Sequence, residues 1–95
     1  MNKMSSRTDA NQPRIISSLR AAGATVVVLS EVGSGCPDII AGWRGHNYFF
    51  EIKNLTGRGN RLTEAQTNWI KGWAGQVAVV YNEQDALAVL YGSYE

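Results

Sequence analysis

The hydrophobic and polar residues of this chain follow two different spacings, which together predict a mixed succession of helices and strands. Apolar residues that recur three and four positions apart predict three helices, over about residues 10–22, 64–74 and 83–91. Short apolar runs rich in β-branched and aromatic residues predict four strands, over residues 24–31, 38–43, 47–53 and 77–81. The expected order of elements is therefore αβββαβα.

Residues that favour helix ends support several of these boundaries. Proline is tolerated only in the first turn of a helix, so Pro13 belongs close to the start of the first helix. Gly23 is expected to end that helix in the left-handed conformation. Thr63 and Gln66 have the spacing of a capping box at the start of the second helix, and Asn82 is a suitable cap for the third.

The connections between the elements predict how the strands are arranged. The segment 44–47 reads as a hairpin turn, so the second and third strands are expected to be antiparallel. The helix at 64–74 is a crossover connection, which places the strand at 77–81 parallel to a neighbour. The first strand, ATVVVLSE at 24–31, is nearly all apolar and is expected to be buried. We therefore expect an α/β fold with a central mixed four-stranded sheet flanked by helices.

The size of the chain, 95 residues, suits one domain with a modest core. We expect a flexible polar tail over residues 1–8 and a single folded domain over 9–95. The one cysteine, Cys36, makes no internal disulfide, and no second cysteine or suitably spaced histidine completes a zinc site. The sequence has neither a signal-peptide pattern nor an apolar run of membrane-spanning length, so no membrane association and a cytoplasmic location are expected.

The charged residues are distributed unevenly, although the net charge is only +1. Residues 1–82 contain all nine Lys and Arg residues against five acidic residues, a net charge of +4, whereas every charged residue from Glu83 onward is acidic. Charge alone leaves two readings open, a mixed solvated surface or a surface that binds a polyanion such as nucleic acid.

Two acidic residues and a lysine form the most informative pattern in the sequence. Asp38 stands at the start of the second strand, and Glu51 and Lys53 lie two positions apart in the third strand. Alternate residues of a strand share one face, so Glu51 and Lys53 are expected on the same side of the sheet. Because a tight hairpin joins the two strands, the start of one pairs near the end of the other. The three side chains are therefore expected to meet.

Two carboxylates and a lysine at one place suit the hydrolysis of a phosphodiester. Carboxylate oxygens bind Mg²⁺ or Mn²⁺, and the backbone carbonyl of Ile52 is a candidate third ligand. The metal would activate a water molecule, and Lys53 would position or deprotonate that water and stabilise the transition state. Each feature alone also has a structural reading, since Glu-x-Lys is common on solvated strands and Pro-Asp is common in turns. The combination favours the catalytic interpretation.

The stretches GSGCPDII at 33–40 and FFEIKN at 49–54 resemble the PD-(D/E)XK nuclease superfamily, which has the restriction-endonuclease-like fold. Within it the resemblance is to the stand-alone virus-type replication-repair nuclease (VRR-NUC) group of phages and bacteria. The resemblance covers most of the chain. In the first helix it includes Gln12 and residues 19–23, and beyond Lys53 it includes residues 61–63 and Gln66.

The resemblance implies a divalent-metal-dependent endonuclease that hydrolyses DNA. It implies a homodimer with a preference for branched DNA, similar to Holliday-junction resolvases, in a bacterial or phage-infected cell. It assigns Asp38 and Glu51 as metal ligands, Lys53 as the catalytic lysine and Gln66 as a residue close to the active site. We expect no organic cofactor, because the glycines at 33–35 lack the spacing of a dinucleotide-binding or phosphate-binding loop.

Several other residues are candidates with more than one reading. Many members of the group have a metal-site glutamate in the first helix, and this chain has Thr8 at the aligned position; whether Asp9 or Gln12 replaces it stays open. Gln66 is equally suited to capping the helix and to the active site. Four arginines are candidate phosphate ligands, two in the loop after the catalytic strand and two near the first helix: Arg58, Arg61, Arg7 and Arg14.

The aromatic residues of the second helix also have two readings. Trp69 and Trp73 lie one helical turn apart and are expected to pack in the core, or to form an interface if the domain dimerises. Two alternatives to a nuclease remain at this point, a binding module of the same fold without catalysis and a subunit-assembly module. The presence of all three residues of the catalytic pattern favours the enzyme over both.

Overall fold

The computed structural model describes residues 11–55 and 60–92 of the chain. In this part the elements follow the predicted order αβββαβα. The helices are α1 (Asn11–Ala21), α2 (Glu64–Gly72) and α3 (Glu83–Gly92). The strands are β1 (Thr25–Val28), β2 (Ile39–Trp43), β3 (His46–Ile52) and β4 (Val77–Val80). None of the helices in the described ranges is both long and apolar enough to cross a lipid bilayer.

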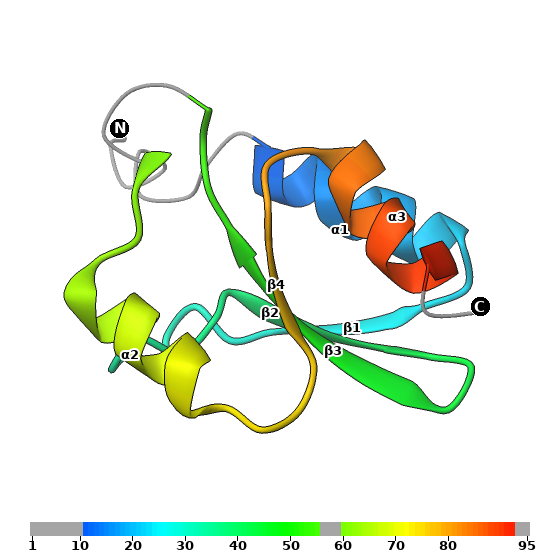
Figure 1. Cartoon of the computed structure of the whole chain (residues 1–95). Coiled ribbons are helices and arrows are strands. Elements are labelled where there is room, and N and C mark those ends of the chain that lie inside the picture. Colours follow the sequence, from blue (N-terminus) through cyan, green and yellow to red (C-terminus); the bar gives the residue numbers. More distant parts are fainter. Residues whose placement is uncertain (1–10, 56–59, 93–95) are drawn as a thin grey trace.

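The four strands form one mixed sheet in the spatial order β1-β2-β3-β4 (Figure 1), and the mixed, four-stranded character of this sheet is as predicted. β1, β2 and β3 are successively antiparallel, and β4 is parallel to β3. The β2–β3 hairpin turns at Arg44 and Gly45, whose φ angles of 51° and 83° are those of a type I′ turn. This turn sets the register in which Ile39 pairs with Phe50, and so it places the start of β2 beside the end of β3.

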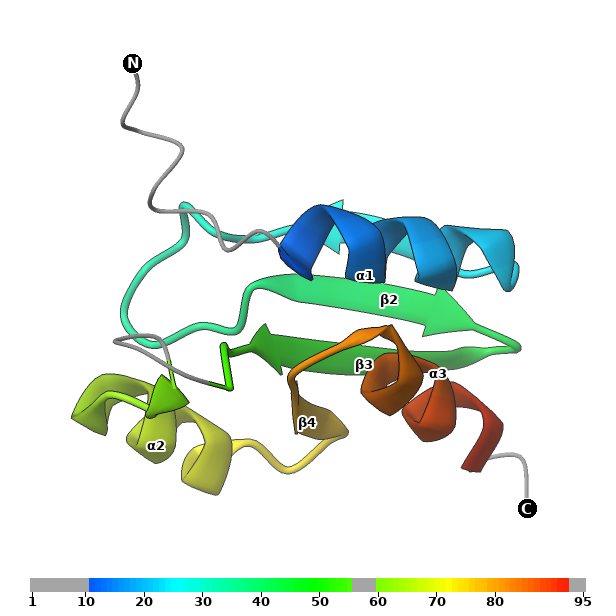
Figure 2. The same ribbon diagram turned by 90° about the horizontal axis from the view of Figure 1, so that it is seen from above.

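The hydrophobic core lies between one face of the sheet and the pair of helices α1 and α3. The two helices contact each other on this side of the sheet, which faces the viewer in Figure 2; α1 also contacts β1, and α3 contacts β4. Alternate residues of β2 and β3 point towards them, which is the period-two pattern expected for a strand with one buried face. The residues that form this core are Ile15, Leu19, Ala24, Ile39, Ala41, Trp43, Tyr48, Phe50, Ile52, Val80, Ala86 and Leu90.

The predicted helix ends are confirmed. Gly23 has a φ of 102°, its N–H bonds the carbonyl of Arg20, and the next N–H bonds the carbonyl of Leu19, which together form a Schellman motif. Thr63 and Gln66 form both halves of the capping box. The side chain of Asn82 accepts a hydrogen bond from the N–H of Asp85 at 2.8 Å.

The prediction of a long, buried first strand is wrong. β1 spans only Thr25–Val28, and the side chains of Val27 and Val28 are exposed. The reason is its place at the edge of the sheet, where the core covers one face over a short length only. An apolar run shows that a segment is suited to a strand, but it does not show how many faces of that strand are covered.

The prediction that Trp69 and Trp73 pack in the main core is also wrong. None of the residues of α2 is buried. This helix lies on the other side of the sheet from α1 and α3 (Figure 1). There Trp69 and Trp73 stack on each other, with ring centroids 4.8 Å apart, and both pack edge-on against Phe49 of β3. The helix therefore covers the face of β3 that also carries Glu51.

Candidate active site

The start of β2 and the end of β3 hold the predicted catalytic residues together. The N–H of Asp38 bonds the carbonyl of Phe50 at 3.1 Å, which extends the strand pairing by one residue. The Oδ2 atom of Asp38 then accepts a hydrogen bond from the N–H of Ile52 at 2.7 Å. Asp38 is thus fixed through both its backbone and its carboxylate, directly beside Glu51.

Glu51 is the buried acid of the site, with 2% of its surface exposed. Its Oε2 atom lies 3.9 Å from Nζ of Lys53, which is itself 9% exposed, so the pair is largely screened from bulk water. Alternation along β3 and the residue after it puts both side chains on the same face, as the sequence predicts. This is the face that α2 covers. A buried carboxylate beside a buried ammonium group is costly to desolvate, which is unusual in a purely structural strand pair.

Gln66 contributes to the site and to the helix cap at the same time. Its Oε1 accepts a hydrogen bond from the N–H of Thr63 at 2.9 Å, which is the capping contact. Its Nε2 donates to Oε2 of Glu51 at 3.2 Å. The capping prediction for Gln66 is therefore confirmed, and the other end of the same amide group bonds the predicted catalytic residue Glu51.

The direction of the Ile52 carbonyl follows from the regular geometry of the strand. In a regular strand, the N–H and C=O groups of one residue point to the same edge. The N–H of Ile52 points towards Asp38, so the carbonyl of Ile52 faces the same edge. Its oxygen therefore lies on the side of β3 where the Asp38 carboxylate is located.

Cys36 lies near enough to the candidate site for its thiol to respond to the charges there. Burial raises the pKa of this thiol, and the negative charges of Glu51 and Asp38 raise it further. The same effect keeps the thiol protonated and makes Cys36 a poor nucleophile.

The donor atoms of this site fit a hard divalent cation. Two carboxylates and a backbone carbonyl are oxygen ligands of the kind that Mg²⁺ and Mn²⁺ prefer, and such ions usually keep several waters. In residues 11–55 and 60–92, no three His, Cys, Asp or Glu side chains come together as a metal-binding group.

The structure describes three of the remaining candidate residues. Gln12 is half-buried in the first turn of α1, and Arg61 is exposed before α2. Arg14 is exposed and forms an ion pair with Glu83 of α3 at 3.5 Å, so this arginine contacts an acidic residue outside the catalytic group. Arg7, Asp9 and Arg58 lie outside the described residues.

One residue of this region was missed by the sequence analysis. Asn11 is buried at the start of α1, and its Nδ2 donates to the carbonyls of Lys53 and Tyr81 at 3.1 and 2.9 Å. A signal was present in the sequence, because Asn11 precedes Ile15 and Leu19 at intervals of four and so lies on the buried stripe of the helix. A polar residue on such a stripe is expected to have a specific hydrogen-bonding partner.

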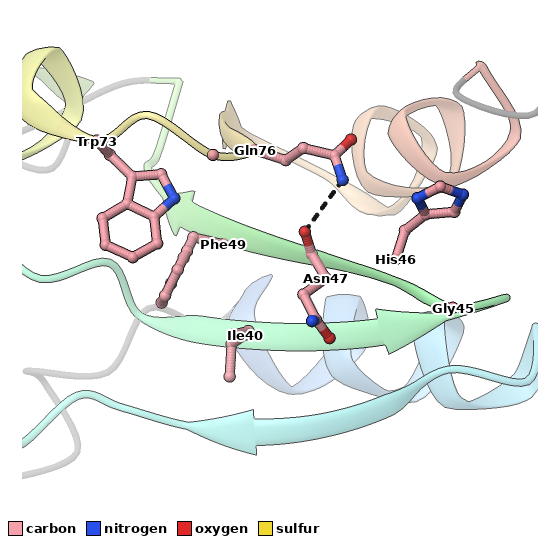
Figure 3. Close-up of a pocket in the computed structure, with 8 residues that line it drawn as sticks. Ile40, Gly45, His46, Asn47, Phe49, Trp73 and Gln76 are labelled. Carbon is pink, nitrogen blue, oxygen red and sulfur yellow. Dashed lines mark hydrogen bonds between the residues drawn. The ribbon is translucent and has the colours of Figure 1, made fainter.

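A groove follows the same sheet face away from the catalytic residues. It has a volume of about 510 Å³ and is lined by residues of the β2–β3 hairpin, the end of α2 and the segment before β4. Figure 3 shows Phe49 and Trp73 at one end of the groove, with Gln76 bonded to the backbone carbonyl of Asn47 at 3.2 Å. None of the lining residues is Lys, Arg, Asp or Glu. The groove is therefore poorly suited to phosphate groups.

The arrangement of elements defines the class of the fold, which is restriction-endonuclease-like. A solved structure described as a VRR_NUC domain is similar over 87% of this chain and 97% of that chain, with a TM-score of 0.65 and 22% sequence identity. No family model and no curated protein matches the sequence. The structural similarity confirms that this chain has the fold of a VRR_NUC domain, as the sequence resemblance predicts.

Proposed function

We propose that this chain is a divalent-metal-dependent nuclease that hydrolyses phosphodiester bonds of DNA. The observation that carries the proposal is the grouping of Asp38, Glu51 and Lys53 at adjoining strand ends. Glu51 and Lys53 are 3.9 Å apart, and Asp38 is bonded to the backbone N–H between them. The fold similarity to a solved structure described as a VRR_NUC domain supports the proposal, because the group that this sequence resembles is one of nucleases.

The carboxylates of Asp38 and Glu51, with the carbonyl of Ile52, would hold the cation, Mg²⁺ or Mn²⁺. When bound, such an ion lowers the pKa of a coordinated water towards neutrality and offsets the charge of the phosphate. The N–H of Ile52 fixes the plane of the Asp38 carboxylate, and Gln66 does the same for Glu51 through its Nε2. Both acids are therefore oriented before any ligand arrives, which reduces the reorganisation needed during the reaction.

Lys53 supplies the positive charge and the hydrogen-bond donors of the reaction. Its ammonium group carries three donors, one of which can be shared with Glu51 while the others face the phosphate and the attacking water. The nine-tenths burial of Lys53 strengthens its interaction with the charge that develops on phosphate oxygens. In this role the lysine orients the nucleophile and stabilises the transition state.

We infer further that branched DNA is the preferred substrate. A domain of 95 residues covers a small surface, so two active sites on one junction require two copies of the chain, related by the two-fold symmetry of the junction. An assay with a labelled four-way junction, a flap and a linear duplex tests this, in Mg²⁺, Mn²⁺ or EDTA. We expect faster cutting of branched substrates and none in EDTA. Equal rates on all three substrates would contradict the preference, and no cutting would contradict the nuclease.

The groove that Phe49 and Trp73 line supports a homodimer in which this face of the sheet is the interface. Trp73 is 42% exposed, and Phe49, Trp69 and Trp73 form an aromatic cluster of the type enriched at protein interfaces. Exposed apolar patches of this kind commonly mark association sites.

Replacing Trp73 by glutamine is therefore expected to convert a dimer to a monomer, as measured by sedimentation equilibrium. The matched control is Tyr91→Gln, an exposed aromatic residue of α3 at 51% exposure, which should leave the mass unchanged. A wild-type protein that sediments as a monomer, or a dimer insensitive to Trp73→Gln, would refute this interface.

A further inference from the structure

The amide of Asn11 joins three elements at one corner of the active site. Asn11 begins α1, whereas its two hydrogen-bond acceptors lie 42 and 70 residues further along the chain. The acceptors are the carbonyl of Lys53, directly after β3, and the carbonyl of Tyr81, directly after β4. An amide NH₂ group has two hydrogens, so one side chain binds both carbonyls.

The contact lies where the pairing of β3 with β4 stops. The N–H of Lys53 bonds the carbonyl of Val80 at 3.0 Å, which is the last contact of this ladder. The next carbonyls of both strands then converge on Asn11. The backbone of Lys53 is thereby held on its N–H by β4 and on its carbonyl by α1. Both bonds restrict the direction in which the Lys53 side chain leaves the strand.

The choice of asparagine at this position is difficult to explain by packing. Asn11 shares a buried stripe with Ile15 and Leu19, where an apolar side chain would fill the space. Its Oδ1 is buried and has no hydrogen-bond partner among the described residues. Burying an acceptor without a partner costs free energy, which the two bonds of Nδ2 must offset. The hydrogen bonds that its amide group donates, rather than the shape of its side chain, therefore explain why asparagine occupies this position.

We propose that Asn11 is a positioning residue for Lys53, and this proposal rests on the nuclease function proposed above. The Nζ–Oε2 distance between Lys53 and Glu51 is 3.9 Å, at the outer limit of an ion pair, so a small backbone shift at Lys53 would separate them. Misplacement of a catalytic group by about 1 Å costs on the order of a hundredfold in rate. Asn11 acts through Lys53 and does not need to touch the substrate.

The test uses the full chain with Asn11→Leu, which removes both donors without adding charge, and Asn11→Ser, which keeps a single shorter donor. The matched control is Ile15→Val, one turn along the same buried stripe, which perturbs the core without touching Lys53. Each protein is assayed at a temperature where circular dichroism shows it folded. We expect single-turnover cleavage to fall about a hundredfold in Asn11→Leu, with DNA affinity measured in Ca²⁺ unchanged.

A double-mutant cycle separates positioning from a general loss of stability. In a Lys53→Met background, Asn11→Leu should cause no further fall in rate, because the group that it positions is already absent. A fall no larger than that of Ile15→Val, or additive effects of the two substitutions, would overturn the proposal. If Asn11→Leu does not fold, Asn11→Ser is subjected to the same cycle.

A second readout does not depend on cleavage. The rate of acylation of the Lys53 amine, followed by mass spectrometry of metal-free protein, reports how firmly this buried side chain is held. It should rise in Asn11→Leu relative to both wild type and Ile15→Val. If the wild-type protein does not cut DNA, the proposed function fails, yet this measurement still tests the contact. An acylation rate that is equal in all three proteins overturns the positioning role.

Discussion

Replacing Lys53 by methionine is expected to lower the single-turnover rate of DNA cleavage about a thousandfold, with the fold retained. Methionine keeps an unbranched side chain of similar length and removes the charge and all three donors. Loss of one group that stabilises the transition state or transfers a proton costs about 10²–10⁴ in rate. A thousandfold loss corresponds to about 4 kcal/mol of transition-state stabilisation.

The matched control for this prediction is Lys71→Met. Lys71 lies in the last turn of α2 and is exposed, so its removal changes the net charge equally without touching the catalytic residues. The Lys71→Met variant should cleave DNA at close to the wild-type rate. If Lys53→Met also cuts within a few-fold of wild type, Lys53 has no chemical role and the assignment of the site is wrong.

Among glycine-to-alanine substitutions in the loop before β2, Gly35→Ala is expected to cause the largest loss of stability. Gly35 has a φ of 84°, and a Cβ at this position would overlap the carbonyl of Ala65, with 2.6 Å to its carbon atom. The obstacle is backbone of the first turn of α2, which cannot rotate away as a side chain can. Strain at φ and overpacking together should cost about 3 kcal/mol, or roughly 15 °C in Tm for a domain of this size.

Gly33→Ala separates the two causes of this loss. Gly33 has a similar φ of 80°, but an added Cβ would meet nothing within 4 Å. The free energy of unfolding of Gly33→Ala should therefore fall by only about 1 kcal/mol, the cost of the left-handed backbone conformation, as measured by thermal unfolding. Gly35→Ala should also slow cleavage more, because the turn it displaces carries Gln66, which bonds Glu51. Equal losses in the two variants would show that the loop does not pack against α2.

The sequence was sufficient to predict the parts of the fold that depend on local periodicity. Helices, strands and their ends follow from apolar spacing and from residues such as Gly23 and Thr63, whose preferences act over a few positions. The meeting of Asp38 with Glu51 and Lys53 was also predictable, since it needs only strand alternation and a tight hairpin. Each of these inferences spans fewer than about twenty residues of chain.

The features that the sequence analysis missed depend on contacts between distant segments. Whether Trp73 is buried depends on which face of the sheet α2 covers, and apolar spacing in a helix is the same on either face. The exposure of Val27 depends on the order of the strands. The role of Asn11 depends on carbonyls of Lys53 and Tyr81, which are brought to α1 only by the complete fold.

The single-turnover cleavage of an end-labelled four-way junction, with Mg²⁺ or EDTA, tests the central claim most directly. The wild-type protein is compared with Glu51→Gln, which keeps the shape of the buried side chain and removes its charge. The account predicts cutting by wild type in Mg²⁺, no cutting in EDTA, and at most residual cutting by Glu51→Gln. Cutting that persists in EDTA, or that is unchanged in Glu51→Gln, would contradict a metal-dependent centre built on Asp38, Glu51 and Lys53.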